Sequence, residues 1–357
     1  MENLGLKKNF WDGRSVLLTG HTGFKGGWAA SLLNMLGAKV HGLSLPPTKA
    51  SRFFNSVGVD GLVVSNEYGN IKNYDDCLRV IKASAPEIII HMAAQPLVRA
   101  SYSYPLETYL VNVMGTANIL EAVRQVDTVE AVVNVTTDKC YKNNEWDWPY
   151  RECEALGGYD PYSSSKACAE IISAAYRDSF LNEKGVQLAT VRAGNVIGGG
   201  DWSKDRLLPD ILRSIDAEKN IIIRSPSSVR PWQHVLEPVT GYLLLAQKLA
   251  EEKNKFDSAW NFGPEENDCW SVGGVASKVC ELLEYSDWTA PATKGPHEAS
   301  FLKLDSSKAK MRLGWRPRWH VDTALQKTIE WHQDFRQQKD MNQTTINQIL
   351  SYQKDNI

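Results

Sequence analysis

The sequence predicts an α/β protein built on a doubly wound parallel sheet, with a smaller α/β lobe toward the C-terminus. Apolar runs alternate with helical patterns from residue 14 to residue 192, a glycine-rich turn follows the first apolar run, and the alternation is lost after Arg192. The 357 residues, 43% of them hydrophobic, are enough for two lobes with a full core.

Composition narrows the class of protein. The 40 basic and 42 acidic residues give a net charge of -2 without a basic block, which argues against a nucleic-acid surface. No stretch is suited to a signal or a membrane segment, and the six cysteines include no C-x-x-C pair. We therefore expect a cytoplasmic protein with a small-molecule ligand and no nucleic-acid, membrane or metal partner.

Alternating strands and helices fill the first half of the chain. The expected strands are at 14–19, 39–45, 61–65, 87–92, 129–136 and 186–192, and the expected helices at 28–36, 74–84, 105–126 and 161–182. In the second half we expect strands at 220–224 and 260–263 and helices at 208–217, 239–251 and 272–284. Residues 1–193 are assigned to a dinucleotide-binding domain, 194–340 mainly to a substrate-binding lobe, although the chain can cross between lobes, and 341–357 to a polar tail.

A glycine-rich turn lies where the first strand is followed by a helix. Gly20, Gly23 and Gly26 allow the backbone to approach a pyrophosphate, whose negative charge would face the N-terminus of the helix. Such turns also occur where only close packing is needed. The turn is the observation that assigns a dinucleotide site to the first domain.

Four polar side chains suit hydride-transfer chemistry. Thr137 and Asp138 follow the strand at 129–136, and Tyr162 and Lys166 share one face of the next helix through their i, i+4 spacing. A nearby cation stabilises tyrosinate, so we expect Lys166 to lower the pKa of Tyr162 and to make it a base near neutral pH.

Six stretches carry a family resemblance. They are T-G-H-T-G-F-K-G at 19–26, H-M-A-A-Q-P-L-V-R at 91–99, T-T-D-K at 136–139, P-Y-S-S-S-K at 161–166, R-A-G-N-V-I-G-G-G-D-W at 192–202 and R-P-W-Q-H-V at 230–235. With them the chain resembles the extended short-chain dehydrogenases/reductases, in particular the nucleotide-sugar 4,6-dehydratases and their CDP-glucose branch. The resemblance implies a Rossmann-type domain.

The resemblance also implies a redox-neutral lyase that converts CDP-D-glucose to CDP-4-keto-6-deoxy-D-glucose and water, in deoxysugar biosynthesis of the O-antigen type. Tyr162 would take the proton of the 4-hydroxyl, which Thr137 also contacts, while C4 gives hydride to NAD. A base would then remove the C5 proton, Asp138 would protonate the departing 6-hydroxyl, and the hydride would return to C6. Lys139, where dTDP-glucose relatives carry Glu, is either the C5 base or a group that stabilises the enolate.

NAD is the cofactor that the resemblance implies. The second strand ends at Ser44 without the acid that often binds the ribose 2'-hydroxyl, so the residues alone leave NAD and NADP open. Asn70 stands where relatives carry an acid, and we expect weak cofactor binding. The implied cofactor contacts are Gly20, His21, Gly23, Phe24, Lys25, Gly26, Ser44, Asn70, Ile71, Ala93, Ala94, Tyr162 and Lys166.

Substrate and subunit contacts are also implied. The candidate substrate residues are Gln95, Arg99, Asn195, Arg206, Arg230 and His297. Arginine suits a diphosphate because its guanidinium binds in a bidentate way. Relatives dimerise through two long helices, which are 105–126 and 161–182 here, so we expect a homodimer with a four-helix seam, or a tetramer of such dimers.

Two other functions stay open. A nucleotide-sugar 4-epimerase or decarboxylase of the same fold would use Tyr162 and Lys166 but would not need the acid Asp138. A non-catalytic NAD(P)-binding sensor is the third candidate, and the presence of Thr137 together with Tyr162 and Lys166 argues against it.

Overall fold

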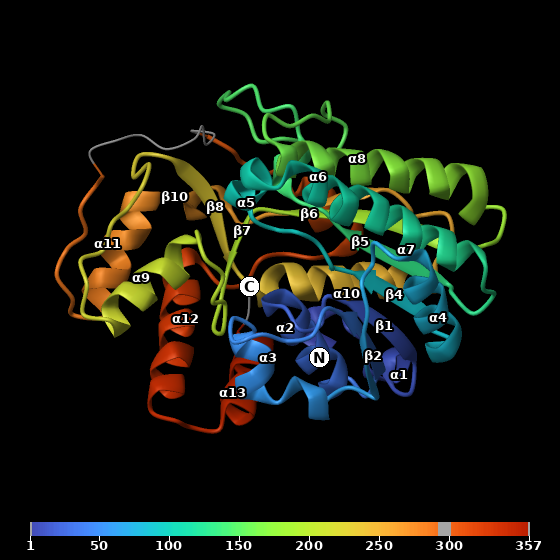
Figure 1. Ribbon diagram of the computed structural model, residues 1–357, viewed down its shortest axis with the longest axis horizontal. Helices are drawn as coiled ribbons and strands as arrows, with labels where there is room; N and C mark the ends of the chain where they lie inside the picture. The colour runs from blue at the N-terminus through green and yellow to red at the C-terminus, as the bar shows by residue number, and fades with distance from the viewer. Residues whose placement is uncertain (1, 292–300, 356–357) are drawn as a thin grey trace.

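A seven-stranded parallel sheet forms the centre of the molecule. The computed structural model describes residues 2–291 and 301–355. The strands are β1 (Ser15–Thr19), β2 (Lys39–Ser44), β3 (Ser65–Tyr68), β4 (Ile88–His91), β5 (Ala131–Val135), β6 (Gln187–Ala193) and β9 (Ala259–Phe262). They follow the order β3-β2-β1-β4-β5-β6-β9, and each neighbouring pair is parallel. The predicted doubly wound sheet is confirmed (Figure 1).

Helices cover both faces of the sheet (Figure 1). They are α4 (Tyr74–Ser84), α7 (Gly115–Arg124) and α8 (Pro161–Tyr176) on one face, and α2 (Phe24–Met35) and α10 (Leu236–Glu251) on the other. Ile88 and Ile90 of β4 face the core under α2 and α10, whereas Ile89 faces the core under α4 and α7. Both faces of β4 are therefore buried, which explains its uninterrupted apolar sequence.

The two long helices expected from the sequence are present, each with one turn of π-helix. The first consists of α6 (Pro105–Tyr109), a π turn (Leu110–Met114) and α7, and the second of α8 and a π turn (Arg177–Leu181). Shorter helical turns connect other elements: η1 (Glu2–Leu4), α1 (Lys8–Trp11), α3 (Arg52–Val57), η2 (Val59–Gly61), α5 (Val98–Ser103), η4 (Asp138–Cys140), η6 (Glu266–Asp268) and η7 (Ala309–Leu313). Within the described residues, no helix combines the length and the apolar character needed to cross a membrane.

A smaller lobe lies beside the sheet, on the left in Figure 1. Its three-stranded sheet has the order β10-β8-β7. Its elements are β7 (Asn195–Ile197), β8 (Val229–His234), β10 (Cys269–Ser271), α9 (Leu207–Asp216), α11 (Val272–Leu282) and α12 (Val321–Arg336). Although α10 and β9 follow residue 194 in sequence, β9 pairs with β6 of the larger sheet and α10 packs against β5 and β6.

Two expected strands differ from the structure. The strand expected at 61–65 begins only at Ser65, because residues 59–61 form a helical turn. The run at 220–224 forms no strand and makes only an isolated bridge between Ile222 and Thr289.

The end of the chain is an ordered helix. Helix α13 (Met341–Lys354) packs against α12, α2 and α3, so these residues of the polar segment form a packed helix. Met341, Ile349 and Tyr352 are buried on one face of the helix, and the Tyr352 hydroxyl donates a hydrogen bond of 2.6 Å to the buried carboxylate of Glu237 on α10. Few apolar residues suffice because the spacing i, i+8 and i+11 places them on one face.

A Tyr352→Phe variant tests the anchoring of α13. The change leaves one oxygen of Glu237 without its side-chain donor, so we expect the free energy of unfolding to fall by about 1–3 kcal/mol. Urea unfolding measures this change. The control is Tyr68→Phe on the edge strand β3, where the ring is 46% exposed. Equal unfolding midpoints for the two variants would contradict an anchoring role.

Candidate active site

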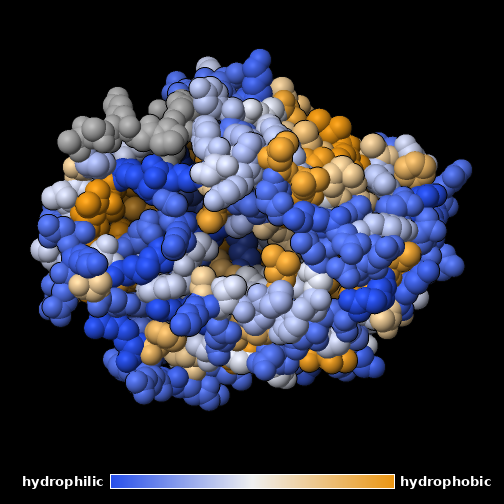
Figure 2. All heavy atoms as spheres, in the orientation of Figure 1, coloured by the Kyte–Doolittle hydropathy of each residue, from blue (hydrophilic) through white to orange (hydrophobic). Residues whose placement is uncertain are grey.

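A cavity of about 710 Å³ opens between the carboxyl edge of the large sheet and the smaller lobe. Figure 2 shows it as a hollow near the middle of the molecule. Of the expected site residues, the cavity is lined by Lys25, Arg99, Thr137, Asp138, Lys139, Tyr162, Asn195, Arg206 and Arg230. The sequence did not point to several other lining residues, among them Tyr141, Tyr159 and Arg224.

The turn after β5 carries three of the expected catalytic residues. Thr137 caps the helical turn Asp138–Cys140, and its hydroxyl donates a hydrogen bond of 2.9 Å to Oδ1 of Asp138. Asp138 is 2% exposed, and its Oδ2 has no hydrogen-bond partner in the described part of the chain. Burial raises the pKa of this carboxyl group, opposed by Lys139, Thr137 and Arg230. Asp138 is thus a carboxyl group that holds its proton more firmly than an exposed aspartate does.

Helix α8 presents Tyr162 and Lys166 to this turn. Asp160 caps the helix by accepting hydrogen bonds from the backbone N–H and the hydroxyl of Ser163, which fixes the first turn where Tyr162 lies. Lys166 Nζ donates to the carbonyl oxygen of Val135 at the end of β5, at 3.1 Å. Burial lowers the pKa of Lys166 to about 8. The expected i, i+4 pair therefore faces the end of β5.

The pKa of Tyr162 differs from the expectation. Burial raises it to about 12, with a hydrogen bond to Thr137 and the charge of Arg206 acting in the opposite direction. The groups that lower it most are Thr137 and Arg206, whereas the ammonium group of Lys166 donates to the backbone of β5. Burial therefore shifts Tyr162 away from the ionised form, in the direction opposite to the expectation.

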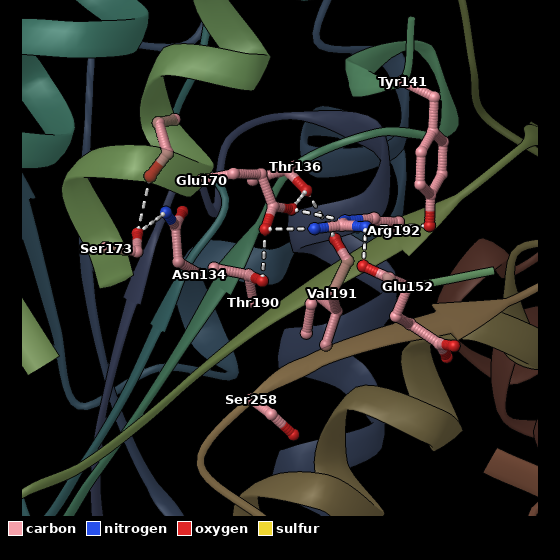
Figure 3. A network of polar contacts seen from close by, with 12 residues as sticks. Asn134, Thr136, Tyr141, Glu152, Glu170, Ser173, Thr190, Val191, Arg192 and Ser258 are labelled. Carbon is pink, nitrogen blue, oxygen red and sulfur yellow. Dashed lines mark hydrogen bonds and ion pairs between the residues drawn. The ribbon is translucent and has the colours of Figure 1, made fainter. Parts of the chain in front are cut away.

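A buried ion pair lies behind the turn and was not foreseen from the sequence. Figure 3 shows Glu170 of α8 between Thr136, Thr190 and Arg192. Arg192 Nε and Nη2 donate to the two carboxylate oxygens of Glu170 at 2.9 and 2.8 Å. The signal that could have found the pair is the position of Glu170, four residues after Lys166 on the same helix face.

The glycine turn has the shape that a phosphate group requires. Gly20 has a φ of +78°, and a Cβ atom there would lie 2.9 Å from the backbone nitrogen of Ala93. A Cβ on Gly26 would overlap the carbonyl oxygen of Gly20. Gly23 precedes α2 without any side-chain cap, so the first amides of α2 remain for an anion. Phe24 and Lys25 occupy this first turn of the helix.

The other expected cofactor residues lie around the carboxyl ends of β1 to β4. His21 is fully buried against Gly42, with Nε2 2.9 Å from Oδ1 of Asn66, so its ring faces the protein interior. Ser44 shares a hydrogen bond of 2.6 Å with Thr22.

The loops after β3 and β4 hold the remaining cofactor candidates. Asn70 accepts a hydrogen bond from the backbone of Lys72, and Ile71 is buried. Ala93 and Ala94 follow β4 directly. These four residues are not among those that line the cavity.

The expected substrate residues separate into two groups. Arg206 pairs with Asp201 at 3.0 Å and Arg99 with Asp205 at 3.7 Å, both at the cavity. Gln95 instead donates to Thr108 Oγ1 and the carbonyl oxygen of Leu97 and accepts from the Leu97 N–H, and it is not among the lining residues.

The last two substrate candidates are Arg230 and His297. Arg230 is 6% exposed and donates to the carbonyl oxygen of Val229 at the cavity. His297 lies outside the described residues. No group of three His, Cys, Asp or Glu side chains gathers into a metal site in the described ranges.

Known proteins with similar sequences come from nucleotide-sugar metabolism. The CDP-glucose 4,6-dehydratase of Salmonella typhimurium is 49% identical over 353 residues, which cover 97% of this chain and 98% of that protein. A probable dTDP-glucose 4,6-dehydratase of Sinorhizobium fredii is 23% identical, with 89% of this chain and 92% of that protein covered.

Solved structures share the fold. A dTDP-glucose 4,6-dehydratase from Streptomyces venezuelae with NAD and DAU bound gives a TM-score of 0.77 at 21% identity, covering 91% of this chain and 98% of that one. A UDP-glucose 4-epimerase from Thermotoga maritima gives 0.78 at 20% identity, covering 90% and 99%. The family itself is decided by sequence: because the model of the GDP-mannose 4,6 dehydratase family matches residues 17–328, this chain belongs to that family of extended short-chain dehydrogenases/reductases.

Proposed function

We propose that this protein removes water from CDP-D-glucose to give CDP-4-keto-6-deoxy-D-glucose, with NAD as a recycled cofactor. The observation that carries the proposal is the placement of Tyr162, Thr137 and Asp138 in one cavity, with a buried carboxyl group whose pKa is raised. The similarity to the Salmonella protein supports the choice of CDP-glucose. A role in deoxysugar biosynthesis of the O-antigen type, in the cytoplasm, follows from the same proposal.

The glycine turn fits a dinucleotide. Gly20 and Gly26 carry no side chain, and there is no room for one at either position. The N-terminus of α2 has no side-chain cap. A pyrophosphate can therefore approach the backbone of this turn. Gly23, Lys25 and Ser44 complete the contacts that we assign there. When bound, NAD would supply a reversible hydride acceptor for the sugar, and its positive ring would favour ionised Tyr162.

Tyr162 receives the proton of the sugar 4-hydroxyl in this proposal. Its hydrogen bond to Thr137 and the charge of Arg206 both favour the ionised phenol, against the effect of burial. Thr137 contacts the same sugar hydroxyl. Lys166 holds Tyr162 and the end of β5 in place through its bond to the Val135 carbonyl oxygen.

Asp138 is the acid for the departing 6-hydroxyl. Burial favours its protonated form, and Oδ2 is the oxygen without a hydrogen-bond partner in the described chain, so it can hold the transferable proton. Lys139 lines the same cavity, and we assign to it either removal of the C5 proton or stabilisation of the enolate that forms. The 4-keto group makes the C5 proton acidic enough for this step.

The phosphates of the substrate are assigned to the cationic side of the cavity. Arg99, Arg206 and Arg230 line it from the large domain and from the smaller lobe, and Asn195 lies beside them. Fork-shaped guanidinium groups match a diphosphate, and partial burial strengthens the attraction.

A 4-epimerase is the second candidate, because a UDP-glucose 4-epimerase shares the fold. An epimerase needs the tyrosine but has no hydroxyl to expel. The buried acid Asp138 therefore favours the dehydratase.

We also propose a homodimer. Exposed apolar side chains lie on two adjacent helical segments. The first is α6 with the π turn after it, and the second is α8 with the π turn after it. Figure 2 shows apolar atoms in this region at the upper right. They are Leu106, Leu110 and Met114 on the first segment and Ile171 and Phe180 on the second. A second copy of this chain would bury them in a four-helix seam.

Turnover against CDP-, dTDP-, UDP- and GDP-glucose, with and without added NAD, tests the proposed function. We expect CDP-glucose to give the alkali-sensitive chromophore of a 4-keto product. An isomer of the substrate without that chromophore would point to an epimerase, and no turnover with bound cofactor would point to a sensor.

An Asp138→Asn variant tests the acid. The amide keeps the size of the side chain and can still accept from Thr137, but it cannot transfer a proton. We expect kcat to fall by about 10²- to 10⁴-fold, as for loss of a general acid or base, with the Kd for CDP unchanged. The control is Asp178→Asn, whose side chain is 62% exposed. Wild-type kcat in Asp138→Asn would exclude this residue as the acid.

Charged substitutions test the dimer. The double variant Leu106→Glu and Ile171→Glu places carboxylates in the seam, so sedimentation equilibrium should give the mass of one chain instead of two. The control is Met311→Glu on η7, where the side chain is 81% exposed. A wild-type mass of four chains would mean that dimers pair further, and an unchanged mass in the double variant would exclude this seam.

A further inference from the structure

The ion pair of Glu170 and Arg192 has no part in the chemistry described above. Both side chains are almost fully buried, with exposed fractions of 4% and 3%, and neither is among the residues that line the cavity. A buried ion pair is weak evidence for stability, because the loss of hydration can exceed the attraction between the charges. Its place in the fold suggests a different role.

The pair is bonded to both ends of the turn that carries the catalytic residues. Thr136, just before the turn, donates to Glu170 Oε1 at 2.5 Å. Tyr141, just after it, accepts from Arg192 Nη1 at 2.8 Å. Residues 137–140, which include Asp138, are therefore held from two sides by one pair of charges (Figure 3).

The same pair is bonded to the catalytic helix. Glu170 follows Tyr162 by eight residues and Lys166 by four, so all three lie along one face of α8. Any shift of α8 relative to the turn would break the bonds at Glu170, because Arg192 holds that carboxylate from β6.

We propose that Glu170 and Arg192 form a positioning pair for the dehydration, holding the turn 137–140 against Tyr162 and Lys166 through Thr136 and Tyr141. This inference rests on the proposed function. It assigns the pair no contact with the substrate.

The elimination step should depend on the pair more than C5 proton removal does. In that step the C6–O bond breaks, the 6-hydroxyl takes a proton from Asp138 and leaves as water, and the electrons of the C5–H bond form the C5=C6 double bond. Asp138 is held at Oδ1 by Thr137, so the placement of Oδ2 follows the backbone of the turn. A displaced turn slows C6–O cleavage, and the C5 proton then exchanges with solvent more often before water leaves.

Three variants separate positioning from general loosening. Thr136→Val and Tyr141→Phe each remove one bond between the pair and the turn and leave both charges in place. Thr190→Val is the matched control, because Thr190 donates to Oε2 of the same carboxylate at 2.6 Å but lies on β6, away from the turn.

The readout is a ratio measured in D2O with CDP-glucose. Deuterium at C5 of recovered substrate is divided by the product formed, so the amount of active enzyme cancels. We expect the ratio to rise by about tenfold in Thr136→Val and Tyr141→Phe, a fraction of what a general acid contributes, and to stay within about twofold of wild type in Thr190→Val. Wild-type ratios in the first two variants, or an equal rise in the control, would overturn the proposal.

Backbone amide exchange of residues 137–140 is the second readout and needs no substrate. It should be faster in Thr136→Val and Tyr141→Phe than in wild type and unchanged in Thr190→Val. If wild-type protein does not convert CDP-glucose, the proposed function fails, whereas amide exchange still decides whether the pair holds the turn. Unchanged exchange in both turn variants would refute the positioning role.

Discussion

The Glu170–Arg192 ion pair is the interaction on which, in our proposal, the arrangement of the active site depends. Burial acts to raise the pKa of Glu170, but hydrogen bonds from Arg192, Thr136 and Thr190 lower it on balance, so the carboxylate stays charged. Removing one partner of such a pair typically costs about 3–5 kcal/mol, because the other charge is left buried alone. The pair thus bonds α8 to β6 and to Thr136 at the end of β5.

Burial also shifts the charge state of groups in the cavity and behind it. It lowers the pKa of both Lys25 and Lys166 to about 8, raises that of Tyr162 to about 12 and raises that of Asp138. All four groups are shifted toward their neutral forms, as expected where water is largely excluded. A negative charge beside Lys25 would favour its protonated form.

Much of the larger domain could be predicted, because its signals are local. The apolar run at 87–92 requires a strand covered on both faces, and the spacing of Tyr162 and Lys166 requires a shared helix face. Long-range pairing could not be predicted. Nothing in the sequence around Trp260 indicates that β9 pairs with β6. The few apolar residues of α13 predict no buried face until the packing of α12, α2 and α3 against this helix is known.

In the site, too, local motifs could be predicted from the sequence and long-range contacts could not. The positions of Thr137, Asp138 and Tyr162 follow from sequence motifs, whereas the pKa values of Asp138 and Tyr162 depend on burial that only the assembled fold creates. Gln95 was assigned to the substrate from its place after β4, but its side-chain amide is bonded to Leu97 and to Thr108 of α6. Glu170 was overlooked because its partner Arg192 lies 22 residues away, on another element.

The late position of β9 has a consequence for synthesis on the ribosome. The last strand of the large sheet follows β7, α9 and β8 of the smaller lobe in the chain. It spans Ala259–Phe262. Until those residues emerge, β6 has an unpaired edge, and α10, which covers β5 and β6, arrives only shortly before. Between the synthesis of β6 and that of β9 the nascent chain thus has an open strand edge, a state prone to wrong pairing. The two lobes are separate in space, but their elements alternate in the order of synthesis.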